Sequence, residues 1–153
     1  MTKRLDYFLT SPLAMDILLE QESYLQRQFS TAHSVTTTIW ELVKLRVSQI
    51  NQCAYCIDMH SKDALKLGES PARIYGLSAW IDMPFYSETE RSALAWAELI
   101  TSGQHVAEEH YQRALDGFGA QGLVDLTIAI NAINGWNRIA RTFKPEVGSY
   151  KTS

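Results

Sequence analysis

Apolar residues recur at intervals of three or four positions along most of the chain, from Leu13 to Phe143. This spacing places side chains on one face of an α-helix. No segment shows the alternation of apolar and polar residues that is typical of a half-buried strand. The pattern therefore predicts an all-α protein, built as a compact bundle of about six to seven helices.

Residues that begin or end helices divide this pattern into segments. Ser11 and Ser70 each precede a proline, which is favoured at the first helical position, and Ser87 with Glu90 matches a capping box. Glycines that follow two of the segments are typical of C-terminal caps. The predicted helices cover about 11–29, 36–51, 53–67, a short stretch from 70, 87–103, 107–117 and 120–143.

The length of the chain, 153 residues with 46% hydrophobic content, suits one core of ordinary size. The sequence contains no internal repeat, no low-complexity segment and no linker rich in Gly, Ser or Pro. We therefore expect a single domain over residues 1–153. The last seven residues, VGSYKTS, are expected to form a loose tail.

The charged residues, 14 Lys and Arg against 17 Asp and Glu, are spread along the chain without a basic cluster that could neutralise a run of phosphates. The N-terminal stretch meets Asp6, Asp16 and Glu20 before it could form the apolar segment of a signal peptide or a spanning helix. We therefore expect no nucleic-acid partner, no membrane partner and a cytoplasmic location.

The segment CAYCIDMH, residues 53–60, contains the only two cysteines of the chain and a histidine. On a helix that begins near Cys53, the spacing places Cys56 and His60 on the same face. Cα atoms three residues apart in a helix are about 5 to 6 Å from each other, which a disulfide accepts. A helix start favours a thiolate, and His60 could act as the base for Cys56. The spacing thus indicates a redox-active thiol pair.

Other interpretations of these residues stay open. Cys53, Cys56 and His60 make only three ligands, whereas a structural zinc site takes four, and no other histidine has a ligand-like spacing to them. Two buried, inert cysteines are also possible, because free cysteine is among the most buried residue types. Glu41, considered alone, would be a solvated helix residue paired with Lys44 one turn on.

The run WELVKLRVSQINQCAYCIDMHSKDALKLG, residues 40–68, resembles the core motif of the carboxymuconolactone decarboxylase-like superfamily, in its AhpD-type alkylhydroperoxidase branch. The resemblance rests on a glutamate twelve residues before the first cysteine, the CxxC pair, and a histidine four residues after the second cysteine. Residues 87–101 and 129–143 resemble later helices of the same family. The resemblance implies an AhpD-like fold, with the core motif at about 36–103 and a C-terminal helix at about 120–143.

The resemblance also implies a role for each site residue. Cys56 would be the peroxidatic thiol, Cys53 the resolving thiol, His60 the proton acceptor, and Glu41 the carboxylate that orients or completes the relay. No metal and no cofactor is required. Some peroxidases of the family carry a histidine between the cysteines, whereas this chain has Ala54 and Tyr55, so a second proton carrier is missing there.

The function that follows from this resemblance is a thiol-dependent peroxidase that reduces organic or hydrogen peroxide through a dithiol/disulfide cycle. An external dithiol, lipoyl-type or thioredoxin-like, would reopen the disulfide. The family also implies assembly into homotrimers or hexamers. This would fit an apolar surplus of the last helix, which we expect to carry apolar side chains on more faces than one small core can cover. A decarboxylase is one alternative, although such members generally lack the CxxC pair. A non-catalytic redox-sensing or binding protein is the other.

Overall fold

Hydrogen-bonding caps set the beginnings of several helices in the computed structural model, which describes residues 3–153. The Thr36 side chain accepts the backbone N–H of Ile39, and Ser87 with Glu90 forms a complete capping box. The helices are α1 (Tyr7–Thr10), α2 (Pro12–Thr31), α3 (Thr37–Ile50), α4 (Ala54–Lys66), α5 (Pro71–Gly76), the 3-10 turn η1 (Leu77–Ala79), α6 (Glu88–Ser102) and α7 (Glu108–Phe143).

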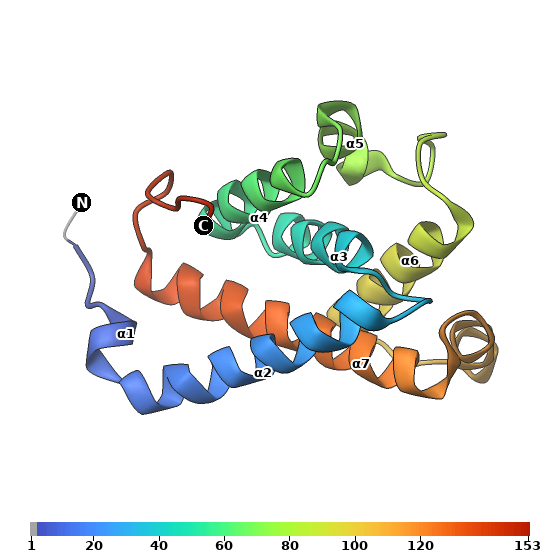
Figure 1. Ribbon diagram of the computed structural model, residues 1–153, viewed down its shortest axis with the longest axis horizontal. Helices are drawn as coiled ribbons and strands as arrows, with labels where there is room; N and C mark the ends of the chain where they lie inside the picture. The colour runs from blue at the N-terminus through green and yellow to red at the C-terminus, as the bar shows by residue number, and fades with distance from the viewer. Residues whose placement is uncertain (1–2) are drawn as a thin grey trace.

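These helices pack into a compact bundle, and residues 3–153 contain no β-strand, so the predicted all-α fold is confirmed (Figure 1). The two residues of the predicted 1–153 domain that precede Lys3 lie outside the described part of the chain. Within that part, no helix is both long and apolar enough to cross a bilayer.

The long helix α7 consists of two helical segments that meet at Gly119. This glycine has φ 72° and ψ 168°, which interrupts the helical backbone and lies in the region that favours glycine. The break agrees with the predicted separation between 107–117 and 120–143, and Figure 1 shows the first segment turned away from the second. The short helix α1 was not predicted, because its four residues are too few to show a period.

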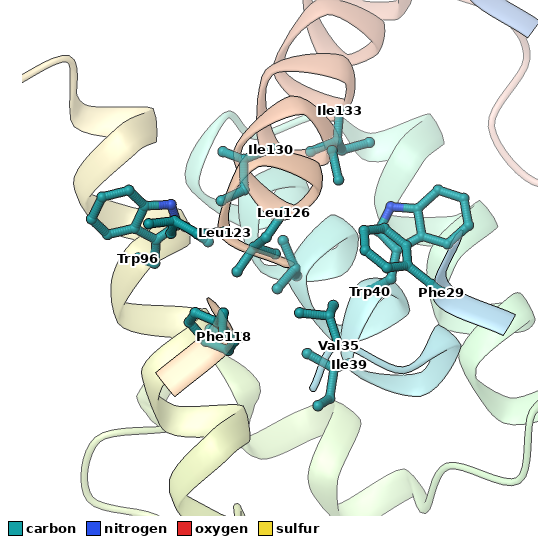
Figure 2. Close-up of a cluster of buried hydrophobic side chains, with 14 of the residues drawn as sticks. Phe29, Val35, Ile39, Trp40, Trp96, Phe118, Leu123, Leu126, Ile130 and Ile133 are labelled. Atoms are coloured by element: carbon teal, nitrogen blue, oxygen red, sulfur yellow. The ribbon is translucent and has the colours of Figure 1, made fainter. Parts of the chain in front are cut away.

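The main core lies where α2, α3, α6 and α7 meet. A cluster of buried apolar side chains joins all four helices, and the rings of Trp40 and Phe29 pack at a tilt with centroids 5.3 Å apart. Figure 2 shows the apolar residues of α7 pointing toward α3 and α6. The labelled members are Phe29, Val35, Ile39, Trp40, Trp96, Phe118, Leu123, Leu126, Ile130 and Ile133.

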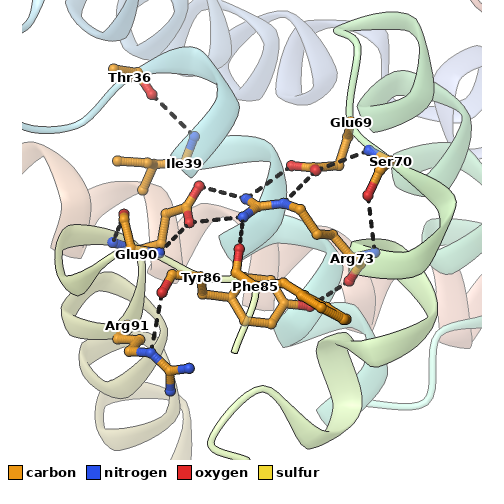
Figure 3. Close-up of polar contacts among 10 residues, drawn as sticks. Thr36, Ile39, Glu69, Ser70, Arg73, Phe85, Tyr86, Glu90 and Arg91 are labelled. Carbon is orange, nitrogen blue, oxygen red and sulfur yellow. Dashed lines mark hydrogen bonds and ion pairs between the residues drawn. The ribbon is translucent and has the colours of Figure 1, made fainter. Parts of the chain in front are cut away.

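A partly buried ion-pair network joins α5 to the start of α6 (Figure 3). The Arg73 guanidinium donates to Glu69 at 2.6 Å and to Glu90 at 2.5 Å, and it also reaches the backbone carbonyl of Phe85. The Tyr86 hydroxyl donates to the Arg73 carbonyl. The hydrogen bonds to Glu90, and those to Glu69, raise the pKa of Arg73, so this cation stays charged and ties the two helices together.

Replacing Arg73 by alanine is expected to lower the free energy of unfolding by about 2 to 4 kcal/mol, because two glutamates lose their shared cation in a site of limited solvent access. The exposed pair between Arg113 and Glu109 provides the control, and Arg113→Ala should change stability by less than about 0.5 kcal/mol. Urea unfolding measures both values. Equal effects of the two substitutions would contradict a stabilising role for the network.

Several of the most exposed apolar side chains lie on α1 and the first half of α2, and the second segment of α7 is better covered. Leu9, Leu13 and Ile17 are 83%, 79% and 68% exposed. In the second segment of α7, which the structure describes in full, Val124 is the one large apolar residue with an exposed side chain, at 56%. The expectation that the last helix carries the apolar surplus was therefore wrong, because its apolar positions face α2, α3 and α6.

Candidate active site

The turn between α3 and α4 is fixed by amide side chains from α7. The Asn51 side-chain amide donates to Asn134 at 2.9 Å and to Asn137 at 3.0 Å, and Asn137 in turn donates to the Ser48 hydroxyl at 3.0 Å. Asn137 is fully buried, so each of these bonds replaces one that water would otherwise supply. Because Cys53 follows this turn directly, these hydrogen bonds position Cys53.

The two cysteines stand at the beginning of α4. Cys53 is the N-cap residue, and its sulfur accepts the backbone N–H of Cys56, in the first turn, at 3.4 Å. The prediction that the helix begins near Cys53 is therefore confirmed to within one residue. The Cα atoms are 5.3 Å apart and the sulfurs are joined in a disulfide. Both residues are buried, at 1% and 4% exposure, against Ala140 of α7 and beside Tyr55.

A buried carboxylate from α3 meets the histidine one turn after Cys56. The Glu41 Oε1 atom lies 2.6 Å from His60 Nδ1, and its other oxygen accepts from Lys44 Nζ at 2.7 Å. The Lys44 ammonium also lies 3.8 Å from the centroid of the Trp40 ring. Burial alone would raise the pKa of Glu41, but the hydrogen bond from His60 and the charge of Lys44 lower it, so this carboxyl is ionised.

This geometry combines two interpretations of Glu41 that the sequence left as alternatives. The carboxylate pairs with Lys44 one turn on, as expected for a helix glutamate, and its other oxygen holds His60. It is not solvated, because only 4% of its surface is exposed. A short hydrogen bond to an ionised carboxylate fixes the orientation of an imidazole ring.

The His60 side chain lies close to two carboxylates, those of Glu41 and Asp63. Ligand atoms of Glu41, His60 and Asp63 lie within 4.8 Å of one another in the described part of the chain. The zinc site considered from the sequence would use thiolates of both cysteines, whereas here Cys53 and Cys56 are bonded to each other. The cation beside Glu41 is the Lys44 ammonium.

The C-terminal residues contribute to the site, which the sequence did not indicate. The Tyr150 hydroxyl donates to both carboxylate oxygens of Asp63, at 2.8 and 3.1 Å, and Lys62 Nζ donates to the Tyr150 carbonyl. The expectation of a loose tail was therefore wrong, because three hydrogen bonds hold it to α4. The signal that could have shown this is the one aromatic residue of the tail, Tyr150 itself.

Comparison with known proteins shows which family the chain belongs to. The model of the carboxymuconolactone decarboxylase family matches residues 23–99, a span that includes Glu41, both cysteines and His60. The chain belongs to the carboxymuconolactone decarboxylase family. Its place in the AhpD-type branch of that family, which the resemblance of the core motif implied, is likewise confirmed by a solved structure that is 32% identical.

Two relatives cover nearly the whole length of this family member. The uncharacterized protein YdfG of Bacillus subtilis is 42% identical over 142 residues, which are 92% of this chain and 93% of its own. A protein of unknown function from Agrobacterium tumefaciens, connected with antioxidant defence as an AhpD, is 32% identical with a TM-score of 0.85, over 99% of this chain and 100% of its own. Both therefore align with nearly the whole of this chain.

A more distant structure shows that this fold also occurs with other chemistry. The debrominase Bmp8, solved in complex with 2,3,4-tribromopyrrole, is 17% identical with a TM-score of 0.78, over 92% of this chain and 73% of its own. At this identity the similarity concerns the fold alone. The reaction of the present family member must therefore be argued from its own residues.

Proposed function

We propose that this AhpD-like protein is a thiol-dependent peroxidase that reduces organic or hydrogen peroxide through the Cys53–Cys56 pair. The observation that carries the proposal is the buried hydrogen bond of 2.6 Å between Glu41 and His60, one helical turn after Cys56. A histidine oriented by a carboxylate next to a thiol is the arrangement that activates a nucleophilic cysteine.

In the first step, His60 takes the proton of the reduced Cys56 thiol, and the thiolate attacks one oxygen of the peroxide. A sulfur–oxygen bond forms while the oxygen–oxygen bond breaks, so the sulfur is oxidised by two electrons to a sulfenic acid. The leaving alkoxide, or hydroxide for hydrogen peroxide, receives the proton from His60. Glu41 holds the ring during both transfers and stabilises the imidazolium between them.

In the second step, the Cys53 thiol condenses with the sulfenic acid. The disulfide forms and the sulfenic oxygen leaves as water, which returns the protein to the state of the present structure. An external dithiol then reduces the disulfide by exchange and is itself oxidised. We expect a lipoyl-type or thioredoxin-like donor, and the reducing cytoplasm is the compartment where such donors operate.

Peroxide treatment of the reduced protein is expected to remove two hydrogens from the single peptide that contains Cys53 and Cys56. Peptide mapping by mass spectrometry measures this loss, and alkylation of the untreated protein provides the control. A pair that stays fully alkylatable after peroxide, or that retains stoichiometric zinc, would contradict the proposal.

We also propose that the protein is a homo-oligomer, a trimer or hexamer, which assembles through the exposed apolar side chains of α1 and α2. Light scattering should give a mass that is a multiple of 17.3 kDa at micromolar concentration. Placing charges at this surface with the double substitution Leu13→Glu and Ile17→Glu should dissociate the assembly, because buried carboxylates lack partners there. Val124→Glu, on another exposed apolar side chain, should leave the mass unchanged, and a strict monomer of the parent protein would contradict the assembly.

A further inference from the structure

The C-terminal segment after α7 folds back onto α4. Figure 1 shows the chain end beside the beginning of α4, next to the turn that carries the cysteines. Two residues of α4 hold it there: Asp63 accepts the Tyr150 hydroxyl at 2.8 Å, and Lys62 donates to the Tyr150 carbonyl at 3.1 Å. Lys62 is itself held by Asp58 at 2.7 Å. The position of Tyr150 is thus fixed at both its hydroxyl and its backbone.

Asp63 connects this tyrosine to the thiol site. Its position three residues after His60 and seven after Cys56 places all three on one face of α4. One of its oxygens lies within 4.8 Å of ligand atoms of both His60 and Glu41. A second carboxylate therefore stands beside the imidazole that Glu41 already holds.

The Tyr150 hydroxyl keeps its proton and donates a hydrogen bond to Asp63. Burial, followed by the hydrogen bond and charge of Asp63 and the charge of Glu41, raises the pKa of Tyr150 to about 12. The hydroxyl therefore keeps its proton throughout the neutral range. Because it bridges both oxygens of Asp63, it spreads the negative charge of this carboxylate and fixes its direction.

The charges around the cysteines come from several elements. The titratable groups around the thiol site come from α3 (Glu41 and Lys44), α4 (Tyr55, Asp58, His60, Lys62 and Asp63), the C-terminal segment (Tyr150) and α1 (Tyr7, beside Tyr55). Lys44 balances Glu41, whereas Asp63 accepts from Tyr150 and has no ion pair with any cation of residues 3–153. A bare carboxylate on this face would disfavour a thiolate, since like charges raise the pH at which an acid ionises.

We propose that Tyr150 is a positioning residue of the thiol site, which holds Asp63 in a hydrogen bond and keeps this carboxylate from competing with Glu41 for His60. The role rests on the proposed function, in which His60 activates Cys56. It extends that function to a residue at the end of the chain, which acts on Cys56 only through Asp63.

The test is the pH dependence of Cys56 alkylation by iodoacetamide in the Cys53→Ser background, where Cys56 is the only thiol. Tyr150→Phe keeps the ring and removes the hydroxyl. We expect its profile to move to higher pH, with alkylation at neutral pH about three- to tenfold slower. Asp63→Asn should move the profile to lower pH, because it removes the charge, and adding Tyr150→Phe to it should have no further effect.

Tyr75→Phe, at a tyrosine that is 81% exposed, is the matched control and should leave the profile unchanged. A Tyr150→Phe profile equal to that control, or a shift of the same size in the presence and absence of Asp63, would overturn the proposal. If Tyr150→Phe fails to fold, Asp63→Asn tests the premise that Asp63 acts on Cys56: a profile that does not move to lower pH overturns the proposal, and one that does supports it. Alkylation needs no peroxide, so a protein without peroxide turnover would refute the proposed function and still give a result here.

Discussion

Cys56→Ser is expected to abolish peroxide consumption by the reduced protein, whereas Cys53→Ser is expected to react once and stop. The reason lies in the positions of the two sulfurs on α4. Cys56 belongs to the first turn and shares a helical face with His60, while Cys53 is the N-cap residue. Without Cys53, the sulfenic acid on Cys56 has no partner for condensation and persists.

A dimedone-type probe distinguishes the two variants. It should label Cys53→Ser after peroxide treatment and leave Cys56→Ser and the parent protein unlabelled. The single remaining thiol in each variant makes the assignment unambiguous, because the chain contains no other cysteine. Labelling of Cys56→Ser at Cys53, with continued peroxide consumption, would reverse the assigned order of attack.

His60→Gln and Glu41→Gln are each expected to slow the reaction of Cys56 with peroxide by about 10²- to 10⁴-fold, the range that general-base catalysis supplies. Glutamine at either position is close in size and keeps a polar group, but it can neither take the proton nor supply the carboxylate. Stopped-flow measurement of the single-turnover rate gives both values. His105→Gln, at an exposed histidine away from α4, is the matched control and should react at the parent rate.

The double variant should react about as slowly as the slower of the two single variants. Glu41 acts through the 2.6 Å hydrogen bond to His60, so removing both groups removes one unit. If the two effects multiplied, Glu41 would act independently of His60. If neither substitution changed the rate, the thiolate would owe its reactivity to the start of α4 alone, and the relay would be absent.

Much of the fold and part of the site could be predicted from local sequence. Caps such as Ser87 and breaks such as Gly119 act within a few residues, so the helix boundaries followed from the chain itself. The cysteine spacing likewise fixed the 5.3 Å separation of their Cα atoms. The contact of Glu41 with His60 joins two helices, and no periodicity indicates it. Only the resemblance to the family suggested that contact.

The remaining parts of the site depend on long-range contacts. The hydrogen bonds that hold the α3–α4 turn join Asn51 to Asn134 and Asn137, which are more than eighty positions away. Isolated asparagines carry no local signal of such a role. Tyr150 reaches Asp63 across 87 positions, because α7 returns the chain end to α4. The apolar surplus was assigned to the last helix because amphipathic patterns do not show how many neighbours cover a helix.

The most direct test of the thiol peroxidase account is the stoichiometry of one turnover. Fully reduced protein is mixed with less than one equivalent of cumene hydroperoxide, and the alcohol formed and the thiols lost are counted. We predict one alcohol and two lost thiols per peroxide, with repeated turnover once dihydrolipoamide is added. Peroxide consumption no faster than with Cys56→Ser, or one oxidation that no dithiol reverses, would contradict a peroxidase and leave a redox sensor at most.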